Sequence, residues 1–187
     1  MDKIEPVHYT EMGTRLGRLI VVWKLKRGTP AVVRIFLAGD TGEVNAFRRE
    51  LFPGATHVSH GAIEGLCMSI RNFLAGHAVA FSLSMLDMGV CGEFQRGVLR
   101  GTAGIPRGMV STYGQIAKRI GTAGGARAVG GALAGNPFPF VIPCHRVVRS
   151  DGHPGGFGGG TGMKRDLLTM EGVAFDSKGR VLPGFFR

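Results

Sequence analysis

The sequence predicts an α/β (α+β) fold in two domains, one over residues 1–90 with strands and helices and one over residues 91–187 that is mainly helical. Two observations predict this fold. Runs rich in Val, Ile and Leu occupy the beginning of the chain, and helical spacing of apolar residues takes over from Glu93 onward. With 187 residues, 44% of them hydrophobic, the chain can bury a core. The change of pattern places the domain boundary near residues 88–92.

The first domain is predicted to contain a β-hairpin. Arg18–Leu25 and Ala31–Leu37 are rich in aliphatic residues, and Arg27-Gly28-Thr29-Pro30 is a turn between them. Apolar residues at helical spacing, stopped by Gly76, predict a helix whose inward face consists of Ile63, Leu66, Ile70, Phe73 and Leu74. Two further elements are expected, a short helix over Thr41–Leu51 and a strand over Phe81–Leu86.

The second domain is predicted to contain a helix-turn-helix. Thr112-Tyr113-Gly114-Gln115 fits a capping box, in which the Thr oxygen accepts a backbone amide and the Gln side chain reaches back. Gly121 ends this helix, and Thr122 is expected to cap the next one. The inward faces are Ile116, Ala117 and Ile120 in the first helix and Ala126, Val129, Ala132 and Leu133 in the second. Many residues of the second helix are small, so its backbone can closely approach another helix or DNA.

Two more helices are expected on either side of the helix-turn-helix. Their apolar residues at helical spacing are Phe94, Val98 and Leu99 in the first and Met163, Leu167 and Met170 in the second. The break at residues 105–108 follows the first helix, and Gly172 closes the second. The tail over residues 173–187 carries strand-like apolar residues around a turn at residues 176–179.

The charge of the chain favours a polyanionic partner. Twenty-three Lys and Arg against 13 Asp and Glu give a formal net charge of +10, which promotes nucleic-acid binding through counterion release. A basic surface without a specific partner is the alternative. The apolar runs are too short or too interrupted to cross a bilayer, and the N-terminus lacks the apolar stretch of a signal peptide. We therefore expect a soluble, intracellular protein with no membrane partner.

The cysteines indicate neither a disulfide framework nor a zinc ribbon. Cys67, Cys91 and Cys144 are odd in number and form no CxxC pair, so at least one is expected to be a free thiol. His57 and His60 have the spacing of helical metal ligands, but neighbouring Pro and Gly residues favour a loop with ordinary surface histidines. We expect no metal and no cofactor.

A proline-rich approach to Cys144 is the most informative segment. Prolines within Asn136–Val148 stiffen the chain ahead of a cysteine that is followed by His145 and Arg146. A cationic neighbourhood is expected to lower the pKa of a thiol, and the thiolate is the effective nucleophile. A Cys-His dipeptide alone fits a buried structural cysteine equally well. A direct Cys-His hydrogen bond would need a turn here, or else a bridging water.

The segment Ile142-Pro143-Cys144-His145-Arg146-Val147-Val148 resembles the active-site signature of the O6-alkylguanine-DNA alkyltransferase (methylated-DNA–protein-cysteine S-methyltransferase) family. Other family motifs occur in the same order: Phe94-Gln95-Arg96, Ile105-Pro106-Arg107-Gly108, Tyr113-Gly114-Gln115-Ile116-Ala117, Ala126-Arg127-Ala128-Val129-Gly130, Asn136-Pro137 and Gly156-Phe157-Gly158-Gly159-Gly160. Their co-occurrence over residues 93–172 is far more specific than any single motif. The resemblance implies a ribonuclease-H-like α/β domain over residues 1–90, followed by a winged helix-turn-helix domain over residues 91–187 that binds DNA and accepts the alkyl group.

The resemblance implies direct-reversal DNA repair. The alkyl (methyl) group of O6-alkylguanine would pass irreversibly to Cys144, in a stoichiometric suicide reaction of one turnover that needs no cofactor. By the same resemblance His145 is the base that activates Cys144 through a water, and Glu171 orients and polarises His145. Asn136 ties the loop after the second helix to the active-site segment. Tyr113 hydrogen-bonds the guanine ring and helps it to leave.

The implied partner is double-stranded DNA containing O6-alkylguanine, bound through the minor groove with the damaged nucleotide rotated out. Arg127 would enter the base stack in its place, and the protein would be monomeric when free. Further DNA contacts are implied for Tyr113, Gln115, Ala126, Gly130 and Ser150, and the alkylguanine pocket for Val147, Phe157, Gly158, Gly159 and Lys164. The expected location is the cytoplasm, with the nucleoid in a prokaryote, or the nucleus in a eukaryote.

Three other functions remain as alternatives. An alkyltransferase-like protein would bind the flipped base without accepting its alkyl group, although that family lacks cysteine at the position of Cys144. A helix-turn-helix regulator would only bind DNA. A cysteine hydrolase would use Cys144 and His145 to cleave an ester or amide.

Overall fold

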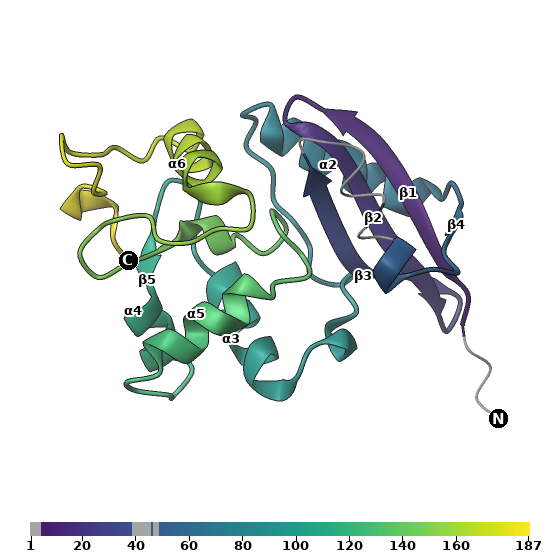
Figure 1. The fold of residues 1–187 in the computed structure, drawn as a ribbon, viewed down its shortest axis with the longest axis horizontal. Helices are drawn as coiled ribbons and strands as arrows, with labels where there is room; N and C mark the ends of the chain where they lie inside the picture. Colours follow the sequence, from purple (N-terminus) through teal and green to yellow (C-terminus); the bar gives the residue numbers. More distant parts are fainter. Residues whose placement is uncertain (1–4, 39–45, 47–48) are drawn as a thin grey trace. The chain divides into compact units, whose positions relative to one another are not determined.

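The chain divides into two compact units, Met1–Val90 and Cys91–Arg187. In the computed structural model, residues 5–38, 46 and 49–187 are described. The first unit contains a sheet and a helix, and the second is mainly helical with a two-stranded sheet (Figure 1).

A four-stranded sheet forms the frame of the first unit. The strands are β1 (Val7–Thr14), β2 (Gly17–Lys26), β3 (Thr29–Ala38) and β4 (Thr56–His57), in the order β3-β2-β1-β4. β2 pairs antiparallel with both β1 and β3, whereas β4 runs parallel to β1. The predicted hairpin is therefore confirmed as β2 and β3. Its two turn residues, Arg27 and Gly28, have φ values of 52° and 79°, which match the positive φ that a tight right-twisted hairpin requires.

The helix predicted before Gly76 is confirmed as α2 (Gly61–Leu74), which packs against β1. Its buried residues include the five predicted for its inward face, together with Cys67. On the sheet, a cluster of Ile20, Val22, Val33 and Phe36 is buried. The helix expected over Thr41–Leu51 lies largely outside the described residues.

The strand predicted over Phe81–Leu86 is wrong. This segment meets β3 at one point only, an isolated bridge between Leu86 and Val32. Val32 donates its amide to the carbonyl of Met85 and accepts from the amide of Asp87. The chain then turns into the 3-10 turn η1 (Met88–Val90), so a continuous ladder does not form.

The predicted helix-turn-helix is present as α4 (Tyr113–Arg119) and α5 (Ala126–Ala134), which pack on each other and on α3 (Glu93–Ala103). Both hydrogen bonds of the predicted capping box form between Thr112 and Gln115. Two details of the prediction are wrong. Phe94 is 41% exposed and does not share the buried face of Val98 and Leu99. Thr122 does not cap α5, because its carbonyl accepts the amide of Gly125 and the helix begins one turn later.

The second unit places the start of α4 beside the segment that carries Cys144. β5 (Ser111–Thr112) pairs in parallel with β6 (Val147–Val148), which follows the 3-10 turn η2 (Cys144–Arg146). The last helix, α6 (Gly160–Met170), ends before Gly172 as predicted. Because β5 leads directly into α4, the pairing brings the helix-turn-helix next to η2.

The C-terminal tail belongs to the core of the second unit. Val110 donates to the carbonyl of Phe185 and accepts from the amide of Arg187, next to the 3-10 turn η3 (Pro183–Phe185). The predicted turn is present, with the Asp176 carboxylate accepting the amide of Lys178. The tail contributes two members, Val173 and Val181, to a buried cluster that also contains Val110, Val148 and Leu168.

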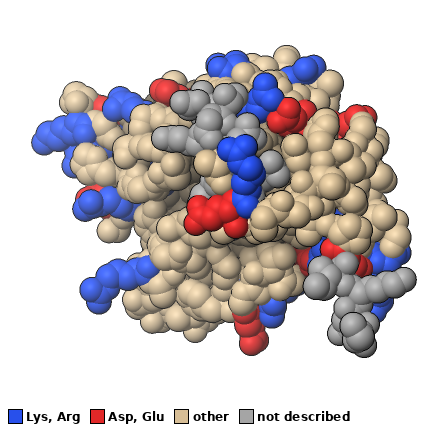
Figure 2. All heavy atoms as spheres, turned by 45° about the vertical axis from the view of Figure 1, so that its right-hand side comes forward, with Lys and Arg blue, Asp and Glu red and all other residues tan. Residues whose placement is uncertain are grey.

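Lys and Arg side chains project separately from the face shown in Figure 2, with Asp and Glu among them. Within the described part of the chain, no helix combines the length and the apolar character needed to cross a membrane.

Removal of the capping box should destabilise the second unit. We expect Thr112→Ala to lower the free energy of unfolding by about 1 kcal/mol, because the amide of Gln115 loses its acceptor. For a protein of this length the melting temperature should fall by about 2–4 °C. Thr112→Ser is the matched control, since it keeps the hydroxyl. Thermal unfolding followed by circular dichroism measures both, and equal melting temperatures for Thr112→Ala and the wild type would contradict the assignment.

Candidate active site

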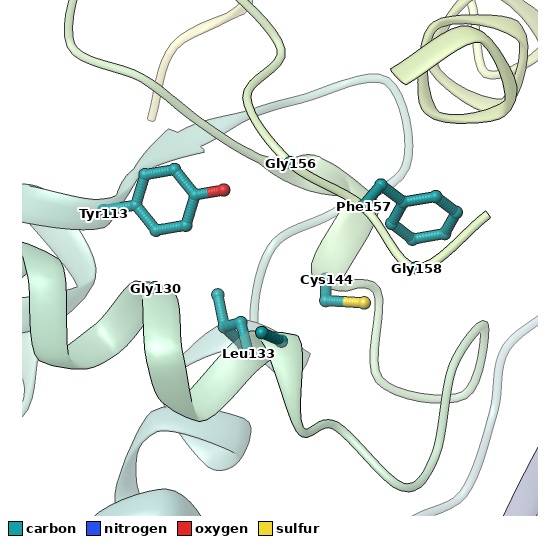
Figure 3. A pocket seen from close by; sticks show the side chains of 8 residues that line it. Tyr113, Gly130, Leu133, Cys144, Gly156, Phe157 and Gly158 are labelled. Carbon is teal, nitrogen blue, oxygen red and sulfur yellow. The ribbon is translucent and has the colours of Figure 1, made fainter. Parts of the chain in front are cut away.

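A cavity of about 410 Å³ opens between α5 and the glycine-rich segment before α6 (Figure 3). It is lined by Tyr113, Gly130, Leu133, Ala134, Cys144, Gly156, Phe157 and Gly158. The hydroxyl of Tyr113 points into this space. The cavity is thus lined by a cysteine from η2, by the phenol of Tyr113 from the first helix of the helix-turn-helix, and by residues of the second helix, α5.

Asn136 anchors the segment that leads to Cys144. Its side-chain amide donates to the carbonyl of Ile142 at 3.2 Å, and its side-chain oxygen accepts the amide of Phe138 at 2.9 Å. The amide of Cys144 donates to Ile142 in turn. These bonds hold the loop after α5 against the residues directly before the cysteine.

Burial raises the pKa of the Cys144 thiol. A hydrogen bond with the Asn136 side chain and the positive charge of Lys164 act in the opposite direction, but burial outweighs them. The expectation of a lowered thiol pKa is therefore wrong in direction. The positive charge that acts on the sulfur is that of Lys164, not of the flanking His145 or Arg146, and the loss of hydration destabilises the thiolate more than Asn136 and Lys164 stabilise it. The thiol is accordingly protonated at neutral pH in the resting protein.

His145, in η2, and Glu171 form a buried hydrogen-bonded pair. His145 Nε2 lies 3.0 Å from Glu171 Oε1, and both side chains are 0% exposed. Burial lowers the pKa of His145, and the hydrogen bond with Glu171 opposes that effect without overcoming it. Burial raises the pKa of Glu171, but hydrogen bonds from His145 and Arg146 outweigh burial and lower it to about 2. The pair at neutral pH is thus a neutral imidazole and a carboxylate.

Arg146 also belongs to this network, a role that the sequence did not predict. Its Nε and Nη2 each donate at 2.8 Å to the two oxygens of Glu171, and its Nη1 donates at 2.6 Å to the carbonyl of Ile105. The sequence feature that could have indicated this role is the position of Arg146 directly after the Cys-His pair. Its partner Glu171 lies 25 residues further along the chain, so spacing alone did not connect them.

Lys164 is buried and holds two segments of the site together. Its Nζ donates to the carbonyl of Val147 at 2.6 Å and to that of Gly156 at 3.2 Å. It also lies 5.8 Å from the centre of the Tyr113 ring. Burial lowers the pKa of Lys164 to about 8, while the charge of Cys144 acts to raise it. The lysine therefore ties β6 to the glycine-rich wall of the cavity.

The residues assigned to the alkylguanine pocket are not all in its wall. Phe157 and Gly158 line the cavity, and the Phe157 ring lies 6.5 Å from that of His145. Val147 and Lys164 are fully buried behind it. Gly159 is the N-cap of α6, where an added Cβ would collide with the sulfur of Met163.

A second hollow adjoins the first along α5. It measures about 460 Å³ and is lined by Tyr113, Gly114, Ala126, Arg127, Gly130, Arg149 and Ser150. Tyr113 and Gly130 line both spaces. All of the residues assigned to DNA contact are in its lining except Gln115, whose side-chain oxygen accepts the amide of Thr112 at 2.7 Å. Arg149 was not predicted, and it pairs with Asp151 at 2.9 Å.

Among the described residues, no group of three or more His, Cys, Asp or Glu is placed to hold a metal ion.

Residues 93–173 match a family described as the DNA-binding domain of 6-O-methylguanine DNA methyltransferase. Over 117 residues the chain is 53% identical to the methylated-DNA–protein-cysteine methyltransferase of Methanothermobacter thermautotrophicus, and this alignment covers 63% of the chain and 65% of that protein. The chain thus spans just under two thirds of the length of that relative.

Two crystal structures of Mycobacterium tuberculosis proteins are similar over most of the chain. O6-methylguanine methyltransferase gives a TM-score of 0.69 at 31% identity, over 88% of this chain and 92% of that one. OGT in complex with DNA gives a TM-score of 0.69 at 30% identity, with the same coverage of 88% and 92%. These similarities confirm the predicted fold class, a ribonuclease-H-like α/β domain followed by a winged helix-turn-helix domain. The proteins that share it are methyltransferases with a DNA-binding domain. The chain belongs to the methylated-DNA–protein-cysteine methyltransferase family.

The raised pKa of Cys144 predicts slow reaction with small electrophiles at neutral pH. Only the thiolate attacks iodoacetamide, so labelling of Cys144 should accelerate roughly tenfold from pH 7 to pH 8. Cys67, which is fully buried and whose pKa is raised to about 11 by burial, provides an internal reference. Timed labelling followed by peptide mass mapping measures both sites. Rapid labelling of Cys144 that does not vary below pH 7 would instead indicate a standing thiolate.

Proposed function

We propose that this protein repairs DNA by transferring the alkyl group of O6-alkylguanine to the sulfur of Cys144. The observation that carries the proposal is the arrangement of Cys144 at a cavity with the buried His145–Glu171 pair directly behind it. A nucleophile, a base and a group that orients the base recur wherever a weak nucleophile must be activated. Family membership and the DNA complex of the Mycobacterium tuberculosis relative support DNA as the partner.

His145 is proposed to accept the thiol proton. Nε2 of a neutral imidazole can approach a carboxylate at 3.0 Å only as a donor, so its proton is on Nε2 and Nδ1 is the acceptor. The proton of Cys144 would reach Nδ1 through a water molecule. The imidazolium that results is stabilised by Glu171, and the thiolate by the charge of Lys164. The raised pKa of the resting thiol fits an anion that forms only when the substrate is in place.

The proposed transfer is an in-line displacement. The thiolate attacks the alkyl carbon, a sulfur–carbon bond forms, and the bond from that carbon to O6 of guanine breaks. The negative charge left on guanine must be neutralised by a proton, and the hydroxyl of Tyr113 points into the cavity from which one can be donated. The product is a thioether, which lacks the ready exchange of a disulfide. Each molecule is therefore expected to act once.

The base must leave the duplex to reach Cys144. We propose that Arg127, exposed on α5 among small residues, occupies the gap while the damaged nucleotide enters the cavity. The hollow that contains Arg127 and Ser150 shares Tyr113 and Gly130 with the cavity of Cys144, which gives a flipped nucleotide a short path. Small residues suit binding in the narrow minor groove. We expect a monomer when free, located wherever the DNA of the cell is.

The main alternative is a protein that binds the lesion without accepting its alkyl group. The orientation of His145 towards Glu171 behind a cysteine favours chemistry over binding alone, because neither a regulator nor a sensor needs a buried base. A cysteine hydrolase would instead turn over esters or amides repeatedly.

Alkyl transfer should add one methylene to the protein. When the protein is mixed with an equimolar duplex containing O6-methylguanine, we expect the intact mass to rise by a CH₂ unit that maps to the Cys144 peptide. Cys144→Ala should bind the same duplex and gain no mass. An unchanged mass of the wild-type protein in the presence of intact lesion would refute the proposal, and repeated hydrolysis of an ester would favour the hydrolase.

Loss of Arg127 should weaken lesion processing more than general DNA binding. Rotating a base out of the stack costs a few kcal/mol, so we expect Arg127→Ala to slow transfer by ~10-fold or more, which corresponds to ~1.4 kcal/mol. Lys118→Ala is a control, since it removes one exposed positive charge from α4. Quenched-flow transfer on lesion duplex and titration with undamaged duplex separate the two effects. Equal transfer rates for both variants would show that Arg127 does not occupy the gap left by the rotated nucleotide.

A further inference from the structure

The Arg146 guanidinium is fixed on two sides by buried acceptors. Two of its nitrogens donate hydrogen bonds of 2.8 Å, one to each oxygen of Glu171, and the third donates at 2.6 Å to the carbonyl of Ile105. The Arg146 side chain is 12% exposed, and that of Glu171 is 0% exposed. A planar fork that meets a carboxylate with two parallel bonds fixes its orientation as well as its charge.

The same carboxylate holds His145. Glu171 Oε1 accepts from Arg146 Nη2 at 2.8 Å and lies 3.0 Å from His145 Nε2, so the arginine and the histidine share one oxygen. A buried carboxylate with the histidine as its only partner would favour an imidazolium, because two opposite charges in contact stabilise each other. With Arg146 in place, the carboxylate is already neutralised. His145 can then remain uncharged and keep an acceptor nitrogen for the proton of Cys144.

We propose that Arg146 is a positioning residue for the alkyl transfer, which neutralises and aligns Glu171 so that His145 rests as a neutral imidazole with its proton on Nε2. This inference rests on the proposed function, because the state of His145 affects repair only if His145 accepts the proton of Cys144. Arg146 does not touch the cavity of Cys144 itself.

The charged and titratable groups around His145 come from several elements. Glu171 and Lys164 approach from α6 and its end, and Arg146 and Cys144 are its neighbours in η2. The helix α3 also packs against η2, but Glu93 and Arg100 on α3 are exposed and Arg96 donates to the carbonyl of Cys91. Burial, Arg146 and Lys164 disfavour the imidazolium, and Glu171 favours it. Loss of the Arg146 charge therefore shifts the balance towards protonation.

The direct test is an NMR titration of the His145 ring nitrogens in the free protein. In the wild type we expect a neutral ring with a protonated Nε2 at pH 7 and above. In Arg146→Met the pKa of His145 should rise by about one unit or more, as expected for an uncompensated carboxylate in contact. The acid limb of the pH profile for alkyl transfer should move upward by the same amount.

Two further variants separate charge from packing. Arg146→Lys keeps the positive charge, so the ring should stay neutral even if the loss of the fork slows transfer. Arg146→Met combined with Glu171→Gln removes both charges, and His145 should then titrate at or below its wild-type pH. The double variant also buries no lone charge, so it remains informative should Arg146→Met alone fail to fold.

The outcomes distinguish this inference from the proposed function. If Arg146→Met lowers the melting temperature while the ring titrates as in the wild type, or if the double variant protonates as Arg146→Met is expected to, Arg146 serves packing only and the inference is overturned. If the wild type transfers no alkyl group, the proposed function fails. The ring titration still decides whether Arg146 controls His145.

Discussion

The parallel pairing of β5 with β6 is the constraint on which the rest of the second unit depends. It joins two residues at the start of the helix-turn-helix, Ser111 and Thr112, to the two valines that follow η2. Tyr113 and Cys144 are thereby held at opposite ends of a two-residue ladder, although 31 positions separate them in the sequence. The tail bridges to Val110 on the other side, so a short strand that would be unstable alone is held from both sides.

Burial decides the charge state of the site. His145, Lys164 and Glu171 are buried and Cys144 is partly buried at the cavity, and for Cys144, His145 and Lys164 burial pushes the pKa towards the neutral form. Glu171 keeps its charge because two donors offset burial. The resting site therefore combines the ion pair between Arg146 and Glu171 with an uncharged cysteine and an uncharged histidine.

Local patterns in the sequence predicted much of the fold, whereas most of the candidate site was indicated by the resemblance to a known family. The β2–β3 hairpin, the capping box at Thr112 and the inward face of α2 depend on residues close together in the chain. β1 was missed because Val7–Thr14 mixes polar residues with few aliphatic ones. The pKa of Cys144 was wrong in direction because flanking basic residues are visible in the sequence and burial is not. Arg146 was missed because its bond to Glu171 closes only in the folded chain.

The glycine-rich wall of the cavity is not uniform in what it can tolerate. At Gly155 φ is +76°, which favours glycine, and a Cβ would lie 3.2 Å from the Tyr113 hydroxyl, which would have to shift. At Gly156 and Gly158 nothing lies within 4 Å of an added Cβ, and neither has a positive φ. Side chains could therefore be introduced at two positions of this run without strain, whereas a third position within four residues of them disfavours any side chain.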